Sequence, residues 1–101
     1  MPTFYRSAQF DRWLAGLKDN IGKARIVQRI RSAELGNLGD VAPVGDGVSE
    51  LRIHVGPGYR VYIARRGEVV YLLLIGGDKS TQTADIRRAK QILQDLPGGE
   101  P

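Results

Sequence analysis

The sequence predicts an α+β fold, in which helices and strands occupy separate parts of the chain. Apolar residues recur at helical spacing in the first third and alternate with polar residues from Val48 to Ala64, and helical spacing returns after Lys79. Because 101 residues suffice for one hydrophobic core and are too few for two, we expect a single domain over residues 1–96 and a flexible tail over 97–101.

The N-terminal part predicts a helical hairpin. Ser7 is a candidate N-cap for a first helix, whose apolar face is Phe10, Trp13, Leu14 and Leu17. Asn20 is a candidate cap for a second helix, whose apolar face is Ile21, Ala24, Val27, Ile30 and Leu35. Residues Thr3–Arg6, before the hairpin, are compatible with a short strand.

Strands are predicted after the turn-forming stretches Gly36–Asp40 and Gly45–Gly47. Two alternating segments flank the turn Gly56–Gly58, and the apolar run Val69–Ile75 predicts a central strand. After a loop at Gly76–Ser80, a C-terminal helix stopped by Pro97 is predicted by the spacing of Ile86, Ala89, Leu93 and Leu96. We therefore expect the hairpin to pack on a sheet of three or four antiparallel strands, with one helix at the C-terminus.

Alternation places a group of polar side chains on one face of the two strands around Gly56–Gly58. If that turn is a three-residue connection, Val55 pairs with Tyr59, and the polar pairs are His54 with Arg60 and Arg52 with Tyr62. The polar face then holds Arg52, His54, Arg60 and Tyr62, with Glu50 beside them. The opposite face, which includes Tyr59, is apolar and is expected to be the core.

Such a face is typical of nucleic-acid binding, because Arg pairs with phosphate, Tyr stacks on bases and His titrates near neutral pH. A solvated strand face with no function gives the same pattern. The amides of Gly76 and Gly77, with Lys79 close behind, could hold an anion at the start of the last helix, although Gly-Gly after a buried strand is also an ordinary turn.

The composition favours an anionic partner. The net charge is +4, and 11 of the 15 cationic residues are arginine, which suits phosphate recognition but also follows from a GC-rich genome. The absence of cysteine excludes disulfides, thiolate metal sites and a Cys nucleophile, and one histidine leaves little for zinc, so we expect no metal and no cofactor. No apolar run is long enough to span a membrane, and we expect a cytoplasmic protein.

Three segments, Gly47–Ile53, Gly56–Tyr62 and Leu72–Ser80, resemble in order and spacing the HigB-like addiction module killer toxins. These form a phage-related branch of the RelE/ParE superfamily of type II toxin–antitoxin modules. The similarity continues through Phe10–Leu14 and Gly36–Asp40 and covers most of the chain. It implies a RelE-like fold.

The resemblance also implies a function. Such toxins cleave mRNA, usually in the ribosomal A site and without a metal, by attack of the RNA 2′-hydroxyl on the adjacent phosphate, which leaves a cyclic phosphate and a free 5′-hydroxyl. Arg60 matches the strand arginine of the family and would stabilise the phosphate. His54 would be the general base, with Arg52 as its electrostatic partner, and Lys79 would stabilise or protonate the leaving group.

Substrate binding is assigned to four further residues. RelE itself carries a functional tyrosine near its C-terminus, and no tyrosine follows Tyr71 here, so Tyr62 or Tyr59 would have to stack on bases. Lys23 and Arg29, on the second helix, would bind RNA by charge.

Two other functions share this fold. A ParE-like inhibitor of DNA gyrase lacks a basic catalytic face, so Arg52, His54 and Arg60 argue against it. A non-catalytic nucleic-acid-binding module would use the basic face for binding alone. The partner implied by the resemblance is an antitoxin from the adjacent gene, expected to be a helix-turn-helix protein, while mRNA and the ribosome are the expected targets.

Overall fold

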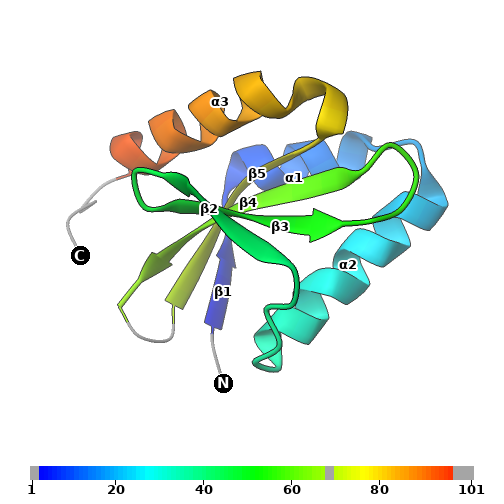
Figure 1. Ribbon diagram of the computed structural model, residues 1–101, viewed down its shortest axis with the longest axis horizontal. Coiled ribbons are helices and arrows are strands. Elements are labelled where there is room, and N and C mark those ends of the chain that lie inside the picture. The colour runs from blue at the N-terminus through cyan, green and yellow to red at the C-terminus, as the bar shows by residue number, and fades with distance from the viewer. Residues whose placement is uncertain (1–2, 68–69, 97–101) are drawn as a thin grey trace.

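The computed structural model describes residues 3–67 and 70–96 of the protein. The elements are β1 (Thr3–Arg6), α1 (Ala8–Gly16), α2 (Asn20–Glu34), β2 (Val41–Gly45), β3 (Val48–Ile53), β4 (Tyr59–Arg66), β5 (Val70–Asp78), the 3-10 turn η1 (Lys79–Thr81) and α3 (Gln82–Asp95). In Figure 1, α3 and α2 lie on opposite sides of the strands. The α+β class, the helical hairpin and the C-terminal helix are therefore confirmed, while the predicted tail, 97–101, lies outside the described residues.

The sheet is larger than predicted. It has five strands in the order β1-β5-β4-β3-β2, and β1 runs parallel to β5 while the other neighbours are antiparallel. The extra strand is β2, which lies between the two predicted turn-forming stretches and contains Pro43. An edge strand tolerates proline because only one of its sides pairs, and glycine and proline hid this short strand from the sequence pattern.

Strand β5 continues through the two glycines that were predicted to form a loop. A Cβ atom at Gly76 would overlap the ring of Trp13, and one at Gly77 would overlap the carboxylate of Asp85. The two glycines therefore let α1 and α3 approach the strand from opposite faces. Their amides belong to the sheet, and the predicted anion cradle is not formed.

Helix α1 begins as predicted, since the Ser7 side chain accepts a hydrogen bond from the Phe10 amide at 2.9 Å. Helix α2 is capped by Asp19 and not by Asn20, and the Asp19 carboxylate accepts from the Gly22 amide at 2.9 Å. The buried face of α2 also differs from the prediction and consists of Gly22, Ile26, Ile30 and Ala33. Gly22 packs against the ring of Tyr59, and a position without a side chain gave no hydrophobic signal.

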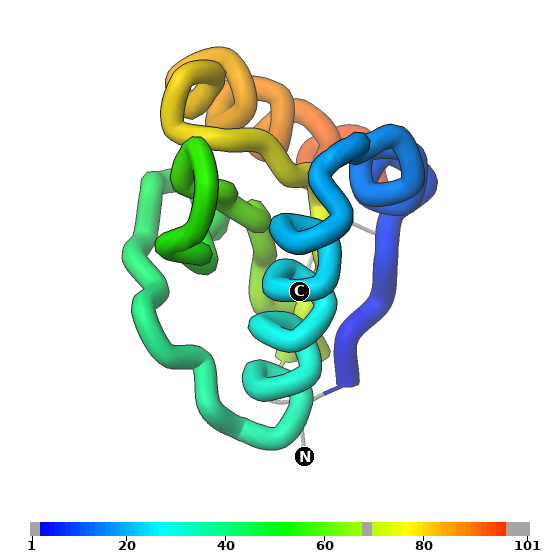
Figure 2. Tube along the Cα trace, turned by 90° about the vertical axis from the view of Figure 1, so that its right-hand side faces the viewer, coloured from blue at the N-terminus to red at the C-terminus, as the bar shows by residue number. Residues whose placement is uncertain are grey.

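The core has two parts, one on each face of the sheet. The helical hairpin covers a cluster formed by Phe10, Leu14, Ile26, Ile30, Ala33, Leu51, Ile53, Tyr59, Val61, Ile63 and Leu73. Helix α3 covers a second cluster, formed by Val48, Tyr62, Ala64, Leu74, Ala89 and Ile92. Figure 2 shows α2 between β1 on one side and the end of the sheet that holds β2 and β3 on the other.

The connection between β3 and β4 is longer than predicted. Ile53 pairs with Tyr59, so the loop runs from residue 54 to 58, and the polar pairs are Arg52 with Arg60 and Glu50 with Tyr62. Because alternation within each strand is unchanged, Arg52, Arg60 and Tyr62 still share a face. His54 follows the strand and lies at the start of the loop.

Candidate nucleic-acid interface

An open groove of about 350 Å³ lies between α2 and the end of β3. Its walls come from one helix and from a strand end with the loop beyond it. The residues that line it are Arg25, Gln28, Arg29, Ser32, Asp40, Arg52, Ile53 and His54. Three arginines, one histidine and a single carboxylate give this groove a cationic character suited to phosphate.

His54 and Asp40 form a close pair at the mouth of this groove. The His54 Nε2 atom lies 2.6 Å from Asp40 Oδ2, and the imidazole side chain is 70% exposed. The hydrogen bond from His54 lowers the pKa of the Asp40 carboxyl below its ordinary value, and the charge of Arg52 acts in the same direction. Since an ionised carboxylate can only accept a hydrogen bond, Nε2 carries a proton, and a neutral His54 has its lone pair on Nδ1.

Arg52 lies between this pair and a buried carboxylate. Its Nη1 is 3.5 Å from Asp40 Oδ1, and its Nε is 3.6 Å from Glu50 Oε2. The side chain of Glu50 is only 2% exposed, whereas that of Arg52 is 37% exposed. Arg52 is therefore held from two sides, with part of its guanidinium group open to solvent.

Glu50 also holds Arg60 on the neighbouring strand. Arg60 Nε lies 3.4 Å from Glu50 Oε2, and the Arg60 side chain is 11% exposed. Gln82, in the first turn of α3, donates to both carboxylate oxygens of Glu50, at 2.9 and 3.0 Å. A continuous series of charged groups therefore runs from His54 through Asp40, Arg52 and Glu50 to Arg60.

Arg29 holds the backbone at the base of the groove through hydrogen bonds to carbonyl oxygens. Its Nη2 donates to the carbonyl oxygens of Leu38 and Asp40, the latter at 3.1 Å, and its Nε donates to the Arg52 carbonyl at 3.3 Å. Partial burial lowers the pKa of this guanidinium from its ordinary value. Arg29, predicted to bind substrate, thus connects α2 to the backbone that carries Asp40 and Arg52.

The prediction that tyrosines stack on bases is wrong for this structure. Tyr59 is buried beneath the helical hairpin, where its hydroxyl donates to Asp19 Oδ2 at 2.7 Å, and this bond raises the pKa of Tyr59 to about 12. Tyr62 is fully buried under α3, and burial, with Glu50 nearby, raises its pKa. Alternation placed Tyr62 on the polar face correctly, but α3 covers this part of that face.

The other predicted site residues, Lys79, Lys23 and Arg60, do not line the groove. Lys79 is exposed on η1, and its side chain lies beside Gly58. Lys23 lies on another surface of α2, where its Nζ is 3.5 Å from the Ala15 carbonyl. Arg60 lies behind the groove, against Glu50, and its burial contradicts the expected solvent-facing arginine.

Arg25 and Asp40 line the groove but were not predicted as site residues. Arg25 is four positions before Arg29, which was predicted, and so shares its face of α2, which was a usable signal. Asp40 gave none, because it lies in a glycine-rich stretch and meets His54 only through the pairing of β2 with β3.

The fold and the groove define a small basic α+β protein with a cation-lined groove beside an exposed histidine–carboxylate pair. The chain is 51% identical, over 87 residues, to an uncharacterized protein of Haemophilus influenzae, and the match covers 86% of this chain and 88% of that protein. The chain belongs to the same family as this protein. No family model matches the sequence.

Two further findings bear on the class of protein. Within residues 3–67 and 70–96, no helix combines the length and the apolar character needed to cross a membrane. The same residues contain no group of three or more histidine, aspartate or glutamate side chains placed to hold a metal ion.

Proposed function

We propose that this protein is a RelE-like toxin of a type II toxin–antitoxin module and that it cleaves mRNA on the ribosome without a metal. The observation that carries the proposal is the His54–Asp40 pair, with its 2.6 Å contact, beside Arg52 in a groove open to solvent. The order of motifs shared with HigB-like toxins supports it independently, and a cytoplasmic location follows from this function.

His54 is the proposed general base. Its Nδ1 atom takes the proton of the RNA 2′-hydroxyl while the 2′-oxygen forms a bond to the adjacent phosphorus. Asp40, hydrogen-bonded at Nε2, stabilises the imidazolium that results. The bond from phosphorus to the 5′-oxygen then breaks, and that oxygen takes up a proton from solvent water, which yields a 2′,3′-cyclic phosphate and a 5′-hydroxyl.

Arg52 is the proposed electrostatic catalyst. The phosphorane gains negative charge as the 2′-oxygen attacks, and a fixed guanidinium stabilises this charge. Glu50 and Asp40 hold Arg52 in place, and Arg60 acts through Glu50 as a positioning residue. Arg25, exposed on the wall of the groove, binds a neighbouring phosphate of the RNA.

The test is cleavage of mRNA on translating ribosomes by the purified protein, with cut sites mapped by primer extension and ends analysed chemically. We expect cuts with cyclic phosphate ends, reduced about 100-fold by His54→Ala and by Arg52→Ala. The matched control is Arg88→Ala, which removes a cation exposed on α3.

Three outcomes would contradict this proposal. If the His54→Ala variant cleaves mRNA at the full rate, His54 is not the general base. If the protein arrests growth without cutting mRNA, its target is another one, such as DNA gyrase, which a supercoiling assay would identify. Salt-sensitive binding of nucleic acid with no cleavage on ribosomes would instead identify a non-catalytic binding module.

The proposed regulator is an antitoxin encoded by the adjacent gene, expected to be a helix-turn-helix protein. It would cover the basic groove or bind against α3 with acidic side chains. Co-purification of the two products from cells tests this. Failure to recover a complex, with both proteins folded, would count against a toxin–antitoxin pair.

A further inference from the structure

A second surface of α2 is apolar and exposed. Among the described residues, the large hydrophobic side chains with high exposure are Tyr5 (60%), Ile21 (72%), Val27 (40%) and Leu35 (67%). Three of these four lie on α2 or directly after it, so the apolar face that the sequence pattern predicted for this helix points outwards except at Ile30, which is buried. A grouped set of exposed apolar side chains marks an interaction surface more often than scattered ones do.

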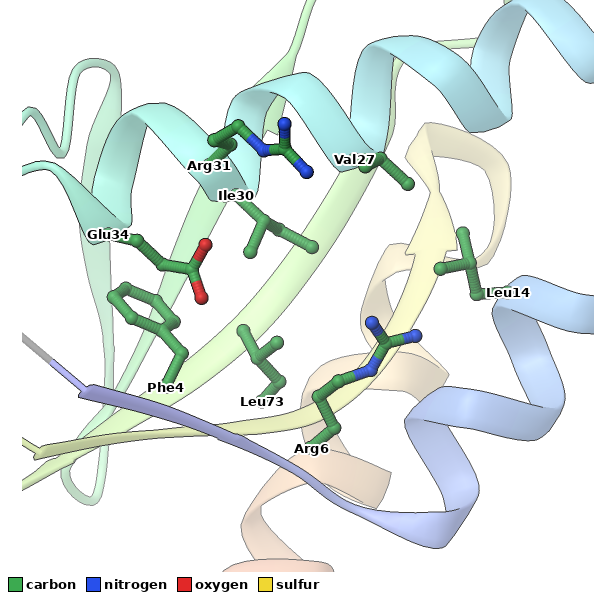
Figure 3. Close-up of a pocket in the computed structure, with 8 residues that line it drawn as sticks. All are labelled: Phe4, Arg6, Leu14, Val27, Ile30, Arg31, Glu34 and Leu73. Atoms are coloured by element: carbon green, nitrogen blue, oxygen red, sulfur yellow. The ribbon is translucent and has the colours of Figure 1, made fainter.

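The apolar surface continues into a crevice between α2 and β1 (Figure 3). Its apolar lining is Phe4, Leu14, Val27, Ile30 and Leu73. With a volume of about 120 Å³, it has room for a single apolar side chain. Val27 and Arg31 line both this crevice and the shallow groove over Asn20–Arg31, so the two are continuous. We call them together the α2 outer groove.

Cations surround this groove. Figure 3 shows Arg6, from β1, and Arg31, from α2, at the crevice, and Lys23 lies farther along α2. Arg6 is paired with Asp11 at 2.6 Å, whereas no ion pair forms on Arg31 or Lys23 among the residues described. Glu34 is the one carboxylate that lines the groove. The rim therefore favours a partner with carboxylates around an apolar centre.

We propose that the α2 outer groove binds an acidic amphipathic α-helix of a partner protein. The part of the groove over Asn20–Arg31 is roughly 16 Å long at the helical rise per residue, which matches a short helix lying along α2. Apolar residues of the partner at positions i, i+3, i+4 and i+7 contact Ala24 and Val27, and one of them enters the crevice. Carboxylates on the flanks of the partner helix meet Arg31 and Lys23.

A second copy of this chain does not fit the same surface. A twofold interface places the same patch on both sides, so Lys23 and Arg31 of each copy would face the like charges of the other. The proposed interaction also goes beyond RNA cleavage, because the outer groove and the groove of Arg52 and His54 share only Gln28 among their lining residues.

The experiment selects binders from a displayed library of helical 20-residue peptides with randomised surface positions, using the full chain as target. We expect enriched peptides to combine helically spaced apolar residues with Asp or Glu. Their affinity should fall about tenfold or more with Val27→Asp and with Arg31→Glu. The matched controls are Gln94→Asp and Arg88→Glu, which make the same charge changes on exposed positions of α3.

Three results would overturn the proposal: a library that yields no binder, binders that are not enriched in Asp or Glu, and binders whose affinity does not change with Val27→Asp. A dimer in light scattering that dissociates on Val27→Asp would assign the surface to a second copy instead. Circular dichroism of each variant verifies folding, and RNA cleavage by Val27→Asp is measured separately, so loss of peptide binding with intact cleavage distinguishes the two proposals.

Discussion

The two faces of the sheet are buried in different ways. Beneath the helical hairpin the core is almost wholly apolar, and its main polar contact is the bond from Tyr59 to Asp19. Beneath α3, apolar residues share the face with Glu50, Arg60 and Gln82. Apolar burial stabilises the fold, whereas buried ions gain little net stability because both lose hydration. The contrast indicates that the hairpin face serves stability and that the α3 face serves to position Arg52.

The strongest test of this contrast is a cavity on the hairpin face. Phe10 is fully buried there, and Phe10→Ala should lower the free energy of unfolding by about 3–5 kcal/mol, because packing contacts and apolar burial are both lost. Urea denaturation monitored by circular dichroism measures this. Thr83→Ala, at an exposed site on α3, should change stability by less than about 0.5 kcal/mol. An equally small effect of Phe10→Ala would refute the assignment of the core.

The next test removes the buried charge from the α3 face. Glu50→Gln leaves Arg60 without a counter-charge and should cost about 1–3 kcal/mol. Adding Arg60→Met should recover much of this loss, since the unpaired buried charge is then gone. Ribosomal mRNA cleavage, if it occurs, should stay low in the double variant because Arg52 lacks its buried partner. A double variant less stable than Glu50→Gln would show that the two residues do not act as a pair.

A smaller effect concerns the polar contact on the hairpin face. With its pKa raised to about 12, Tyr59 favours folding in its neutral form. This stabilisation is complete below pH 10, the ordinary tyrosine value, and is lost as the pH rises towards 12. Absorbance of tyrosinate at 295 nm should show a late-ionising group that is missing in Tyr59→Phe. Asp19→Asn should shift it to lower pH, and an unchanged titration would contradict the hydrogen-bond origin.

The smallest effect is expected at the groove. His54→Ala removes the main cause of the low pKa of Asp40, so that pKa should rise towards the ordinary value of 3.8. The pair contributes above pH 3.8 and is lost as the pH falls through the lowered pKa. Carboxyl carbon NMR measures this titration in the wild type and in His54→Ala. Global stability should change little because the pair is exposed to solvent.

Sequence alone predicts a good part of this fold. Alternation in β3 and β4 places Glu50, Arg52 and Arg60 together regardless of register, and the cap at Ser7 places the start of α1. For α2, the sequence pattern predicts the wrong buried face apart from Ile30. Gly22 contributes to packing through the absence of a side chain, so the larger apolar residues Ile21, Val27 and Leu35, which are exposed, give the stronger signal.

The candidate site was predicted only in part, for a related reason. Alternation tells which side of a strand a residue occupies but not what covers that side. Arg52 and His54 lie at the open end of β3, where no helix covers them, while Arg60 and Tyr62 lie deeper under α3. The role of Asp40 depends on an edge strand that a proline and glycines concealed.

The parallel pairing of β1 with β5 has a consequence for biosynthesis. Ser7, directly after β1, donates through its hydroxyl to the carbonyl of Leu74, 67 residues later, at 2.6 Å. The first strand to leave the ribosome is therefore among the last to find its partner, and contacts so distant in sequence slow folding. A polypeptide released before residue 70 has no β5 on which β1 can dock. Completion of this sheet therefore requires that translation has extended beyond Leu73, the last β5 residue that pairs with β1.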